Sequence, residues 1–571
     1  MFTANSRNGF SLKAYQGSQM TLLALDLQEK PDDSFAGFTL GYINPKGQKN
    51  FIQNLLNFNG TSGFTSSEES PIQLFKWVHF PGSYQQTGIL DGKYTYFAAP
   101  RYFDANKDLI PLKEKDFVKA KINVNDYSEE GFSLGFTRAF IKSQAFSSRY
   151  GAKQKLRPSN ALIFDTMQKA GRNKYGDYTY EDMYAWLGYS ARKIIYDILR
   201  EALNDGSISV DMFAYDFNDP VIADLCLQLA SQGKIRIILD NADLHTTKNG
   251  KVTPEDEFED KFKKKAQTGS EIFRCKFARY AHCKIIILKK DNKPFKILSG
   301  STNFSFNGLY VNANHVLVFD SKNAAQYYED VFNAVWKIGK APAFRLTTFS
   351  NAVQDFSDGS IPITEINFSP HTDQYAGQLL DSITANVKNA KSILFSIMEM
   401  GETTTGSLIK TLRMLHKDDS IYTYGVTDKS GKEISLYKPG RKNGLLINAK
   451  EANRELPPQF LKEHTLPGHA IHHKFVVTDF NKDTARVYCG SSNLALGGEK
   501  ANGDNLICIK DTDVATAFAI ETLRLTDHYN YRSLKDKETK NEPARIKKTP
   551  DWFQRFYDEN DIRCVERKLF A

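Results

Sequence analysis

The sequence predicts an α/β protein in which two similar halves follow an N-terminal β-sandwich. Three observations predict this architecture: the N-terminal part reads as short alternating strands, strand–helix–strand order occurs twice in the rest of the chain, and each round ends in the same motif. Runs of strand, helix and strand favour mostly parallel pairing, with helices on the faces of the sheet. We therefore expect the two halves to pack as pseudo-symmetric lobes.

These patterns divide the chain into five parts. They are a β-sandwich accessory domain at 1–137, a linker and helical stretch at 138–189, a first half at 190–345, a second half at 346–533, and a polar linker with a terminal helix at 534–571. In the first part, strands such as 93–97 and 118–124 are separated by breakers such as 44–47, a spacing typical of a β-sandwich. We expect this domain to serve packing and positioning rather than a separate activity.

Each half alternates helices and strands before its motif. In the first half we expect a helix at 190–203, a strand at 208–215, a helix at 220–232 and a strand at 234–240. In the second half we expect a helix at 375–389, a strand at 392–399, a helix at 407–416 and a strand at 420–426. Because the order repeats, the halves are predicted to share one topology.

Length and composition are those of a folded protein with more than one core. The chain has 571 residues, of which 41% are apolar and 25% charged, and one domain usually holds roughly 100–200 residues. The net charge of +8 gives a mild bias towards anionic partners. Nucleic acid, an acidic lipid surface and a lysine-rich exterior all agree with this charge, so it does not identify a partner.

The sequence gives no sign of export or membrane insertion. No stretch approaches the roughly 20 apolar residues that a membrane-spanning helix needs, and the N-terminus lacks the charged and apolar regions of a signal peptide. The six cysteines include no C-x-x-C pair, which favours free thiols in a reducing compartment over a disulfide framework. We expect a cytoplasmic protein without a transmembrane segment.

The strongest signal is a set of five residues that occurs once in each half. The first set is His282, Lys284, Gly300, Ser301 and Asn303, and the second is His472, Lys474, Gly490, Ser491 and Asn493. In both sets the lysine follows the histidine by 2 residues, the glycine follows it by 18 (300 − 282 and 490 − 472) and the asparagine follows it by 21. Matching residue types at matching offsets disfavour both a chance repeat and two ordinary core histidines.

The spacing suits the chemistry of a phosphodiester. Residues two apart on a strand share a face, so His282 and Lys284 are expected to point together while Cys283 turns into the packing. The glycine permits close approach of backbone to a bound oxyanion. In-line attack needs one group on phosphorus and another that protonates the leaving oxygen, and two histidines divide these tasks at neutral pH. The charged oxygens would be held, without a metal or other cofactor, by Lys284, Lys474, Asn303 and Asn493.

These residues carry a resemblance to a known family. H-x-K-x4-D followed by G-S-x-N is the hallmark of the phospholipase D superfamily, and residues 471–479, ending in Asp479, match it in full. The resemblance covers roughly 190–530 and implies two α-β-α lobes whose motifs meet at their interface. It also implies a phosphodiesterase that works through a phosphohistidine. The histidine of the first motif, His282, is favoured over His472 as the nucleophile.

The first motif departs from the family pattern. Lys289 stands seven residues after His282, at the place that Asp479 fills in the second motif. By resemblance this acid is mostly supporting and is absent from some active members. The departure therefore weakens the assignment of roles more than it weakens the expectation of activity.

Supporting residues are expected around the histidines. A reactive histidine needs its other ring nitrogen held, and the resemblance implies an acid or amide about a dozen residues past each motif asparagine. The candidates are Asn314 in the first half and Asp504 or Asn505 in the second. Ser301 and Ser491 are expected to hydrogen-bond within the site.

Other polar residues near the motifs have structural interpretations. His469, His472 and His473 would suggest zinc. Alternation sends His472 and His473 to opposite faces, however, and no Cys or carboxylate stands at ligand spacing, so we expect no metal and a structural role for His473. Three residues at the ends of strands near the site could shape the pocket, although such residues usually cap turns: Tyr215, Asp216 and Glu399.

The expected substrate is a phosphodiester of one of two classes. A phospholipid, cleaved at its head group or transphosphatidylated, is the leading hypothesis on resemblance alone, and it would bring the protein into peripheral contact with a membrane. Nucleic acid, cut by a metal-independent nuclease, is the alternative, favoured somewhat by the positive charge and the expected location. A third hypothesis is a phosphate-binding module that has lost turnover, as Lys289 would indicate.

Overall fold

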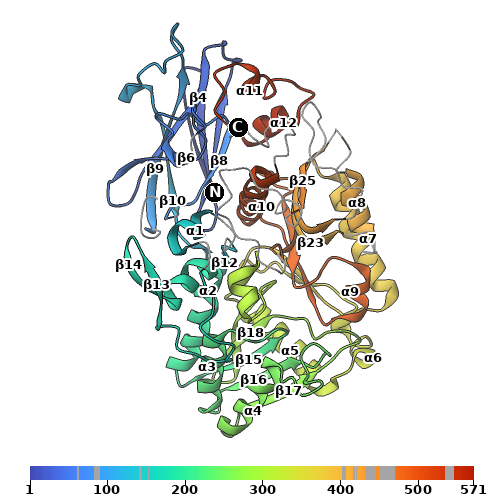
Figure 1. The fold of residues 1–571 in the computed structure, drawn as a ribbon. Coiled ribbons are helices and arrows are strands. Elements are labelled where there is room, and N and C mark those ends of the chain that lie inside the picture. The colour runs from blue at the N-terminus through green and yellow to red at the C-terminus, as the bar shows by residue number, and fades with distance from the viewer. Residues whose placement is uncertain are drawn as a thin grey trace.

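The computed structural model describes residues 1–60, 63–82, 90–139, 144–151, 154–400, 407–415, 418, 421–430, 445–448, 470–533 and 545–571. Strands in these residues form two four-stranded sheets, two eight-stranded sheets and two short two-stranded sheets. In Figure 1 the N-terminal sheets lie at the top left, the green first half lies below them and the second half lies at the right. The fold is therefore of the mixed α/β kind.

The N-terminal sheets form from strands that alternate in polarity. In β10 (Val118–Val124) every second residue is buried and those between are exposed, which is the pattern of a strand with one face on a core. The two sheets have the orders β1-β2-β3-β8 and β10-β9-β4-β5. Their other strands are β1 (Phe2–Arg7), β2 (Phe10–Gln16), β3 (Thr21–Leu27), β4 (Phe35–Ile43), β5 (Lys49–Phe51), β8 (Lys76–His79) and β9 (Gly92–Tyr102), and β6 (Gln53–Asn54) pairs with β7 (Thr65–Ser66) nearby.

Side chains from near the C-terminus complete the core of these sheets. Trp552, Phe553 and Phe556 belong to the same buried cluster as Phe35 and Phe75. They come from α11 (Asp551–Gln554) and the turn after it, and α12 (Ile562–Phe570) follows. In Figure 1 both helices, in red, lie against the blue strands. Of the predicted polar linker and terminal helix at 534–571, residues 534–544 lie outside the described residues.

The first eight-stranded sheet has the order β11-β12-β20-β19-β18-β15-β16-β17. Its strands are β11 (Tyr127–Glu129), β12 (Phe132–Phe136), β15 (Ile208–Ala214), β16 (Ile235–Asp240), β17 (Glu271–Cys275), β18 (Ile285–Lys290), β19 (Lys293–Gly300) and β20 (His315–Phe319). A separate hairpin of β13 (Lys169–Asn173) and β14 (Gly176–Thr179) precedes the long helix α2 (Tyr180–Asn204).

The second eight-stranded sheet has the order β21-β22-β28-β27-β26-β23-β24-β25, so its strands follow one another as those of the first sheet do. Its strands are β21 (Gln354–Phe356), β22 (Thr364–Phe368), β23 (Ser392–Met400), β24 (Tyr422–Ser430), β25 (Leu445–Asn448), β26 (Lys474–Thr478), β27 (Arg486–Gly490) and β28 (Asn505–Ile509). Buried residues of both sheets belong to one hydrophobic cluster, so the two sheets share a core.

The expectation of mostly parallel pairing was wrong. In the first sheet β15, β16 and β17 pair in parallel, whereas β18, β19, β20, β12 and β11 join antiparallel. The second sheet repeats this division. The physical reason is connection length, because a helix links β15 to β16 but only the two residues Asp291 and Asn292 link β18 to β19. A short link forces neighbouring strands to run antiparallel.

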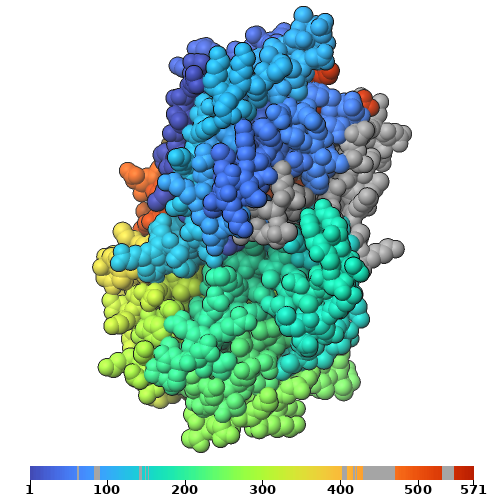
Figure 2. Space-filling model, turned by 90° about the vertical axis from the view of Figure 1, so that its left-hand side faces the viewer, coloured from blue at the N-terminus to red at the C-terminus, as the bar shows by residue number. Residues whose placement is uncertain are grey.

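The stretch predicted as the sandwich, 1–137, contributes strands to four different sheets, one of which is the first eight-stranded sheet. Its last two strands, β11 and β12, extend the first eight-stranded sheet by pairing with β20. Alternation of polar and apolar residues identifies a strand but does not say which sheet it joins. Figure 2 shows the blue N-terminal residues stacked directly on the green first half. Arg138 lies in this junction, 4.3 Å from the ring of Phe80 and 4.1 Å from that of Trp186.

Helices cover the two large sheets and end where their sequence signals predict. At α2 (Tyr180–Asn204) Thr179 and Asp182 form a capping box, and at α5 (Lys322–Ile338) Ser321 caps the start and Gly339 adopts a left-handed conformation after the end. The other helices are α1 (Gln144–Tyr150), α3 (Pro220–Ala230), α4 (Pro254–Lys265), α6 (Ala341–Phe344), α7 (Asp373–Asn389), α8 (Ser407–Leu415), α9 (Leu496–Ala501) and α10 (Thr512–Ser533).

Candidate active site

The two motif segments lie side by side, each paired with the opposite half. The backbone N–H of His282 donates to the carbonyl of Gly503 at 2.8 Å, and that of His472 donates to the carbonyl of Ala313 at 3.1 Å. Both histidines stand just before a strand, since β18 begins at Ile285 and β26 at Lys474. The expectation that they lie on the strands was therefore wrong by two to three residues, because this cross-pairing takes their backbone out of the sheet.

The imidazole rings are held by a crossed pair of hydrogen bonds. Nδ1 of His282 lies 2.6 Å from Oδ1 of Asp504, and Nδ1 of His472 lies 2.9 Å from Oδ1 of Asn314. Each ring is thus oriented by a side chain from the other half of the chain. Because a side-chain oxygen holds Nδ1 in both rings, Nε2 is the nitrogen placed for chemistry, and Nζ of Lys474 lies 3.3 Å from Nε2 of His472. Asn505, the other candidate for this role, donates instead to Ser299 and Tyr328.

Electrostatics favours a neutral ring at His282. Burial and the nearby charge of Lys284 lower the pKa of His282, against the opposing pull of Asp504. Burial alone would raise the pKa of the Asp504 carboxyl, but the attraction of His282 and Lys284 lowers it. At neutral pH the arrangement is therefore an ionised carboxylate beside an imidazole with an available lone pair.

The two motif lysines are buried close to one another. Lys284 donates to the carbonyl of His282, and Lys474 donates to the carbonyl of His472 at 2.8 Å. Burial lowers the pKa of Lys284 to about 8, and burial together with the charge of Lys284 lowers the pKa of Lys474 well below its ordinary value. Two buried cations in one another's field create a place where a bound anion is stabilised.

The asparagine of each motif keeps a polar atom unpaired. Nδ2 of Asn303 donates to Oδ2 of Asp216 at 2.6 Å. In the part of the chain that the structure describes, the Oδ1 atoms of Asn303 and Asn493 are buried without a hydrogen-bond partner. Buried polar atoms are rarely left so, which is consistent with a ligand completing the site.

The motif glycine and serine support the neighbouring strand. Gly300 has φ of 146°, and an added Cβ would lie 2.4 Å from the carbonyl of His315; Gly490 has φ of 120° and would place a Cβ 2.5 Å from the carbonyl of Asn505. Any side chain at these two positions would collide with a strand carbonyl, which explains the need for glycine. Ser301 donates to Asn314 at 2.9 Å, and Ser491 donates to Asn505 at 3.0 Å.

The position of the motif acid makes different contacts in the two halves. Asp479 accepts the backbone N–H of Lys391 at 2.8 Å and the hydroxyl of Thr484 at 3.0 Å. At the matching place Lys289 pairs with Asp211 at 2.7 Å and with Glu329 at 3.5 Å. The departure of the first motif is therefore accommodated by a buried ion pair.

His473 lies on the side opposite His472, as alternation predicts. Its Nδ1 is 3.2 Å from Nδ1 of His315, and its Nε2 is 3.1 Å from a carboxylate oxygen of Glu521. His469 lies outside the described residues. Within the described ranges no group of three or more His, Cys, Asp and Glu side chains is arranged to hold a metal ion.

Two aspartates near the motifs were not identified from the sequence. Oδ1 of Asp240 accepts the backbone N–H of Ala281 at 2.5 Å, and Oδ1 of Asp428 accepts that of Ala470 at 2.7 Å. They occupy matching places on β16 and β24, directly after Leu239 and Thr427, which pair with Ala214 of β15 and Ile397 of β23. An aspartate following each second apolar strand, 42 residues before one histidine and 44 before the other (282 − 240 and 472 − 428), is the signal that could have found them.

The residues singled out at strand ends contribute unequally. The ring of Tyr215 lies 4.6 Å from that of His282, and Asp216 holds Asn303 as described above. Glu399 stands at the place that matches Asp216, since β15 and β23 pair with the motif strands in the same way. These contacts bring Tyr215 and Asp216 into the candidate site.

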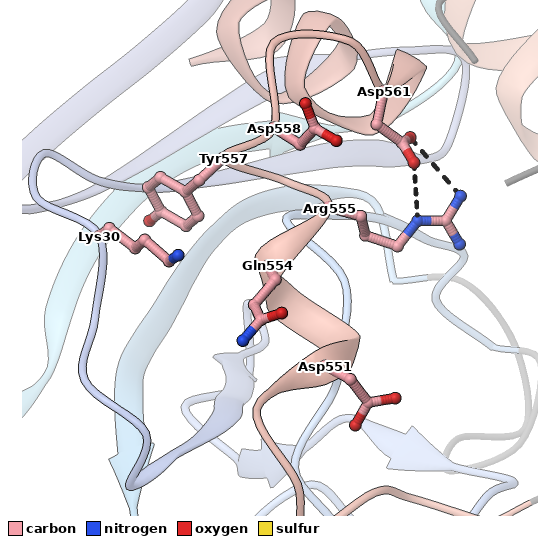
Figure 3. Close-up of a pocket in the computed structure, with 7 residues that line it drawn as sticks. All are labelled: Lys30, Asp551, Gln554, Arg555, Tyr557, Asp558 and Asp561. Atoms are coloured by element: carbon pink, nitrogen blue, oxygen red, sulfur yellow. Dashed lines mark hydrogen bonds and ion pairs between the residues drawn. The ribbon is translucent and has the colours of Figure 1, made fainter. Parts of the chain in front are cut away.

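A separate pocket of about 500 Å³ lies at the N-terminal sheets. Its lining consists of Lys30, Asp551, Gln554, Arg555, Tyr557, Asp558 and Asp561. Figure 3 shows that most of these side chains come from the C-terminal segment, with Arg555 paired to Asp561. The pocket contains no motif residue and is distinct from the candidate active site.

A family comparison agrees with this geometry. Residues 199–336 match the family model described as cardiolipin synthase, PLD-like domain, where PLD denotes phospholipase D. The matched stretch contains the first motif from His282 to Asn303. A phospholipase D-like domain is therefore present. The resemblance to the phospholipase D superfamily that the paired motifs carry is therefore confirmed.

Similar solved structures are distant. Phosphatidylserine synthase from Haemophilus influenzae Rd KW20 is 11% identical over 64% of this chain and 92% of that chain, with a TM-score of 0.41. The phospholipase D family member Nuc from Salmonella typhimurium is 19% identical over 25% of this chain and 87% of that chain, with a TM-score of 0.20. Polyphosphate kinase from Porphyromonas gingivalis is 12% identical over 66% of this chain and 54% of that chain, with a TM-score of 0.38. This chain thus spans about half the length of the polyphosphate kinase. Scores this low carry no argument about reaction or substrate. No curated protein matches the chain.

Across the described ranges, no helix has both the length and the apolar character to cross a membrane.

Proposed function

We propose that this protein is a phosphodiesterase that works through a phosphohistidine intermediate. The observation that carries the proposal is the crossed pair of hydrogen bonds, His282 to Asp504 at 2.6 Å and His472 to Asn314 at 2.9 Å. Two oriented imidazoles from distant parts of the chain are what in-line displacement at phosphorus requires.

The two histidines have different partners, which supports different roles. Asp504 is a carboxylate and stabilises the positive charge that the His282 ring acquires when it bonds to phosphorus, so we assign His282 as the nucleophile. Asn314 is neutral and orients His472 without fixing a charge on it. His472 is then suited to give up a proton and take one back.

The reaction proceeds in two balanced steps. In the first, the lone pair on Nε2 of His282 forms an N–P bond, the P–O bond to the departing alcohol breaks, and His472 gives its Nε2 proton to that oxygen. In the second, His472 takes a proton from water, or from an acceptor alcohol, whose oxygen bonds to phosphorus while the N–P bond breaks. Hydrolysis and transphosphatidylation differ only in this acceptor.

The remaining motif residues bind the phosphate or support the residues that do. Lys284, Lys474, Asn303 and Asn493 would hold the non-bridging phosphate oxygens, where negative charge is concentrated. The supporting residues in this proposal are Asp479, Ser301, Ser491, Asn314, Asp504 and Asn505, through the contacts described above.

We assign a phospholipid as the leading substrate class. The support is the family model, whose description names cardiolipin synthase, an enzyme named for a phospholipid product. In this proposal the halves act as two pseudo-symmetric lobes, the N-terminal sheets serve as a β-sandwich accessory domain, and the protein touches membranes peripherally. The six cysteines are buried and free, which supports a reducing, cytoplasmic location.

A substrate panel tests the proposal. Wild type, His282→Ala and His472→Ala are assayed on bis-p-nitrophenyl phosphate, phosphatidylcholine and cardiolipin vesicles, and labelled DNA and RNA, with His79→Ala as a control in the N-terminal sheets. We expect diester cleavage to fall at least about 10³-fold in both motif variants, to persist in the control, and to include the lipids. Acid-labile, alkali-stable phosphate on the protein would mark the intermediate.

Three outcomes would count against parts of this proposal. Cleavage of no diester by the wild type leaves only a phosphate-binding module. Full activity in both motif variants excludes the mechanism. Cleavage of nucleic acid alone, falling steeply with salt, replaces the lipid by the nuclease alternative.

A further inference from the structure

A third histidine lies beside the first motif without belonging to it. His245 is in the loop after β16 and is buried. Its Nε2 lies 2.8 Å from Oδ1 of Asp216, and its Nδ1 lies 2.7 Å from Oδ2 of Asp240. A single imidazole therefore bridges two carboxylates.

Each of these carboxylates uses its second oxygen to hold part of the motif. Oδ2 of Asp216 accepts the side-chain amide of Asn303 at 2.6 Å. Oδ1 of Asp240 accepts the backbone N–H of Ala281, the residue before His282, at 2.5 Å. The contacts run without a gap from His245 through the two carboxylates to the motif.

An aromatic contact connects the same residues. The ring of Tyr215 is 4.6 Å from the ring of His245 and 4.6 Å from the ring of His282, edge to face in both cases. The ammonium of Lys284 lies 4.9 Å from the centre of the Tyr215 ring. Packing and hydrogen bonds therefore fix His245 against the motif from two sides.

The charges around His245 keep its ring protonated. Burial opposes protonation, but the hydrogen bonds to Asp216 and Asp240, with the charge of Glu255, raise the pKa of His245 to about 9. Arg274 faces the loop as well and donates to the His245 carbonyl. A protonated ring carries a hydrogen on both nitrogens, so it can donate to both carboxylates at once.

We propose that His245 is a positioning residue for phosphodiester cleavage, an inference that rests on the function proposed above. Its ring ties Asp216 to Asp240. Through these two carboxylates it fixes the amide of Asn303 and the backbone that precedes His282 relative to the bound phosphate. Residues that orient site groups in this way commonly affect activity by about 10- to 100-fold.

The second half contains only part of this arrangement within the described residues. Asp428 matches Asp240 and holds the backbone before His472, and Glu399 matches Asp216 in register. The stretch that would correspond to the His245 loop, between β24 and β25, is 431–444 and lies outside the described residues. The proposal therefore concerns the first motif alone.

The test compares His245→Gln with wild type and with His79→Gln, which removes a buried imidazole from the N-terminal sheets. We expect His245→Gln to lower kcat on bis-p-nitrophenyl phosphate by about 10- to 100-fold. We also expect it to weaken binding of inorganic phosphate, measured by calorimetry, by about 10-fold. His79→Gln should change neither. His245→Lys, which keeps a cation with several donors, should recover part of both losses.

A double variant separates positioning from general damage. Because His245 acts in part through Asp216 and in part through Asp240, adding His245→Gln to Asp216→Asn should lower kcat by a smaller factor than His245→Gln lowers it in wild type. Loss of the His245 charge also leaves two carboxylates uncompensated near Lys284, so the alkaline limb of the pH profile should move to higher pH. Thermal melting of every variant checks that it is folded.

Several results would overturn the proposal. These are a kcat and a phosphate affinity for His245→Gln within about twofold of wild type, or losses that multiply with those of Asp216→Asn. If wild type cleaves no diester, the proposed function fails, and phosphate affinity alone decides on His245. Equal affinity in wild type and His245→Gln, including no binding by either, then overturns the positioning role.

Discussion

Asp504 and His282 stand 222 residues apart in the sequence, yet their side chains lie 2.6 Å apart, Oδ1 to Nδ1. The reciprocal contact joins His472 to Asn314, 158 residues away, at 2.9 Å. Neither motif is therefore complete within its own half of the chain. The difference between a carboxylate in one contact and an amide in the other distinguishes the two histidines chemically.

Asp504→Asn should reveal this difference. We expect kcat to fall by about 10- to 100-fold, because the His282 ring loses the carboxylate that orients it and stabilises its charge. Since Asp504 raises the pKa of His282, its removal should move the acid limb of kcat/KM to lower pH. The measurement is a pH–rate profile on bis-p-nitrophenyl phosphate. Asn314→Asp is the matched variant, and an identical profile in Asp504→Asn and wild type would contradict the assignment.

Lys284 should set the alkaline limit of activity. Its pKa is lowered to about 8 by burial, so its charge is present below that pH and is lost as pH rises through it. We expect kcat/KM to decline above about pH 8, and Lys284→Arg to hold its charge to higher pH at reduced activity. A profile that stays flat to about pH 10 would show that this charge is not required.

Restoring the family acid at position 289 should destabilise the protein. Lys289 pairs with buried Asp211 and with Glu329, so Lys289→Asp would set a third carboxylate beside two others. We expect a loss of about 3–5 kcal/mol in the free energy of unfolding, measured by denaturant titration. Lys290→Asp is the control, since Lys290 is 58% exposed and its change should cost under about 1 kcal/mol. Equal losses in both variants would refute a special role for the buried pair.

The stability of the fold should depend on pH through His245. Its pKa is about 9 in the folded protein and about 6.5 when unfolded, so its contribution is fully present below the lower value and is lost as pH rises between the two. The contribution is on the order of 3 kcal/mol. Unfolding free energies from about pH 6 to 9.5 should therefore fall in wild type and fall less in His245→Gln. Parallel curves would contradict this prediction.

The repeated motif could be predicted because it is a pattern in the chain itself. The offsets from His282 and His472 predicted the candidate site residues, and alternation correctly separated His472 from His473. The sequence could not show whether Asp504 or Asn505 contacts His282. The two residues are adjacent, and only the three-dimensional path of the chain into β28 decides which one faces the histidine. His245 was missed because no counterpart at a matching offset marked it. The prediction of mostly parallel strands was wrong because the sequence signals a connection only where it forms a helix. The two-residue link after Lys290, which makes the next strand run antiparallel, left no such signal.

The packing of Trp552, Phe553 and Phe556 into the N-terminal sheets has a consequence for biosynthesis. The ribosome delivers the sheets first and these aromatic side chains more than four hundred residues later than the last sheet strand. During that interval the emerging domain exposes an unfilled apolar face, which makes it a candidate for chaperone contact and for aggregation. The core of the N-terminal sheets can therefore be completed only after the C-terminal segment has been synthesised.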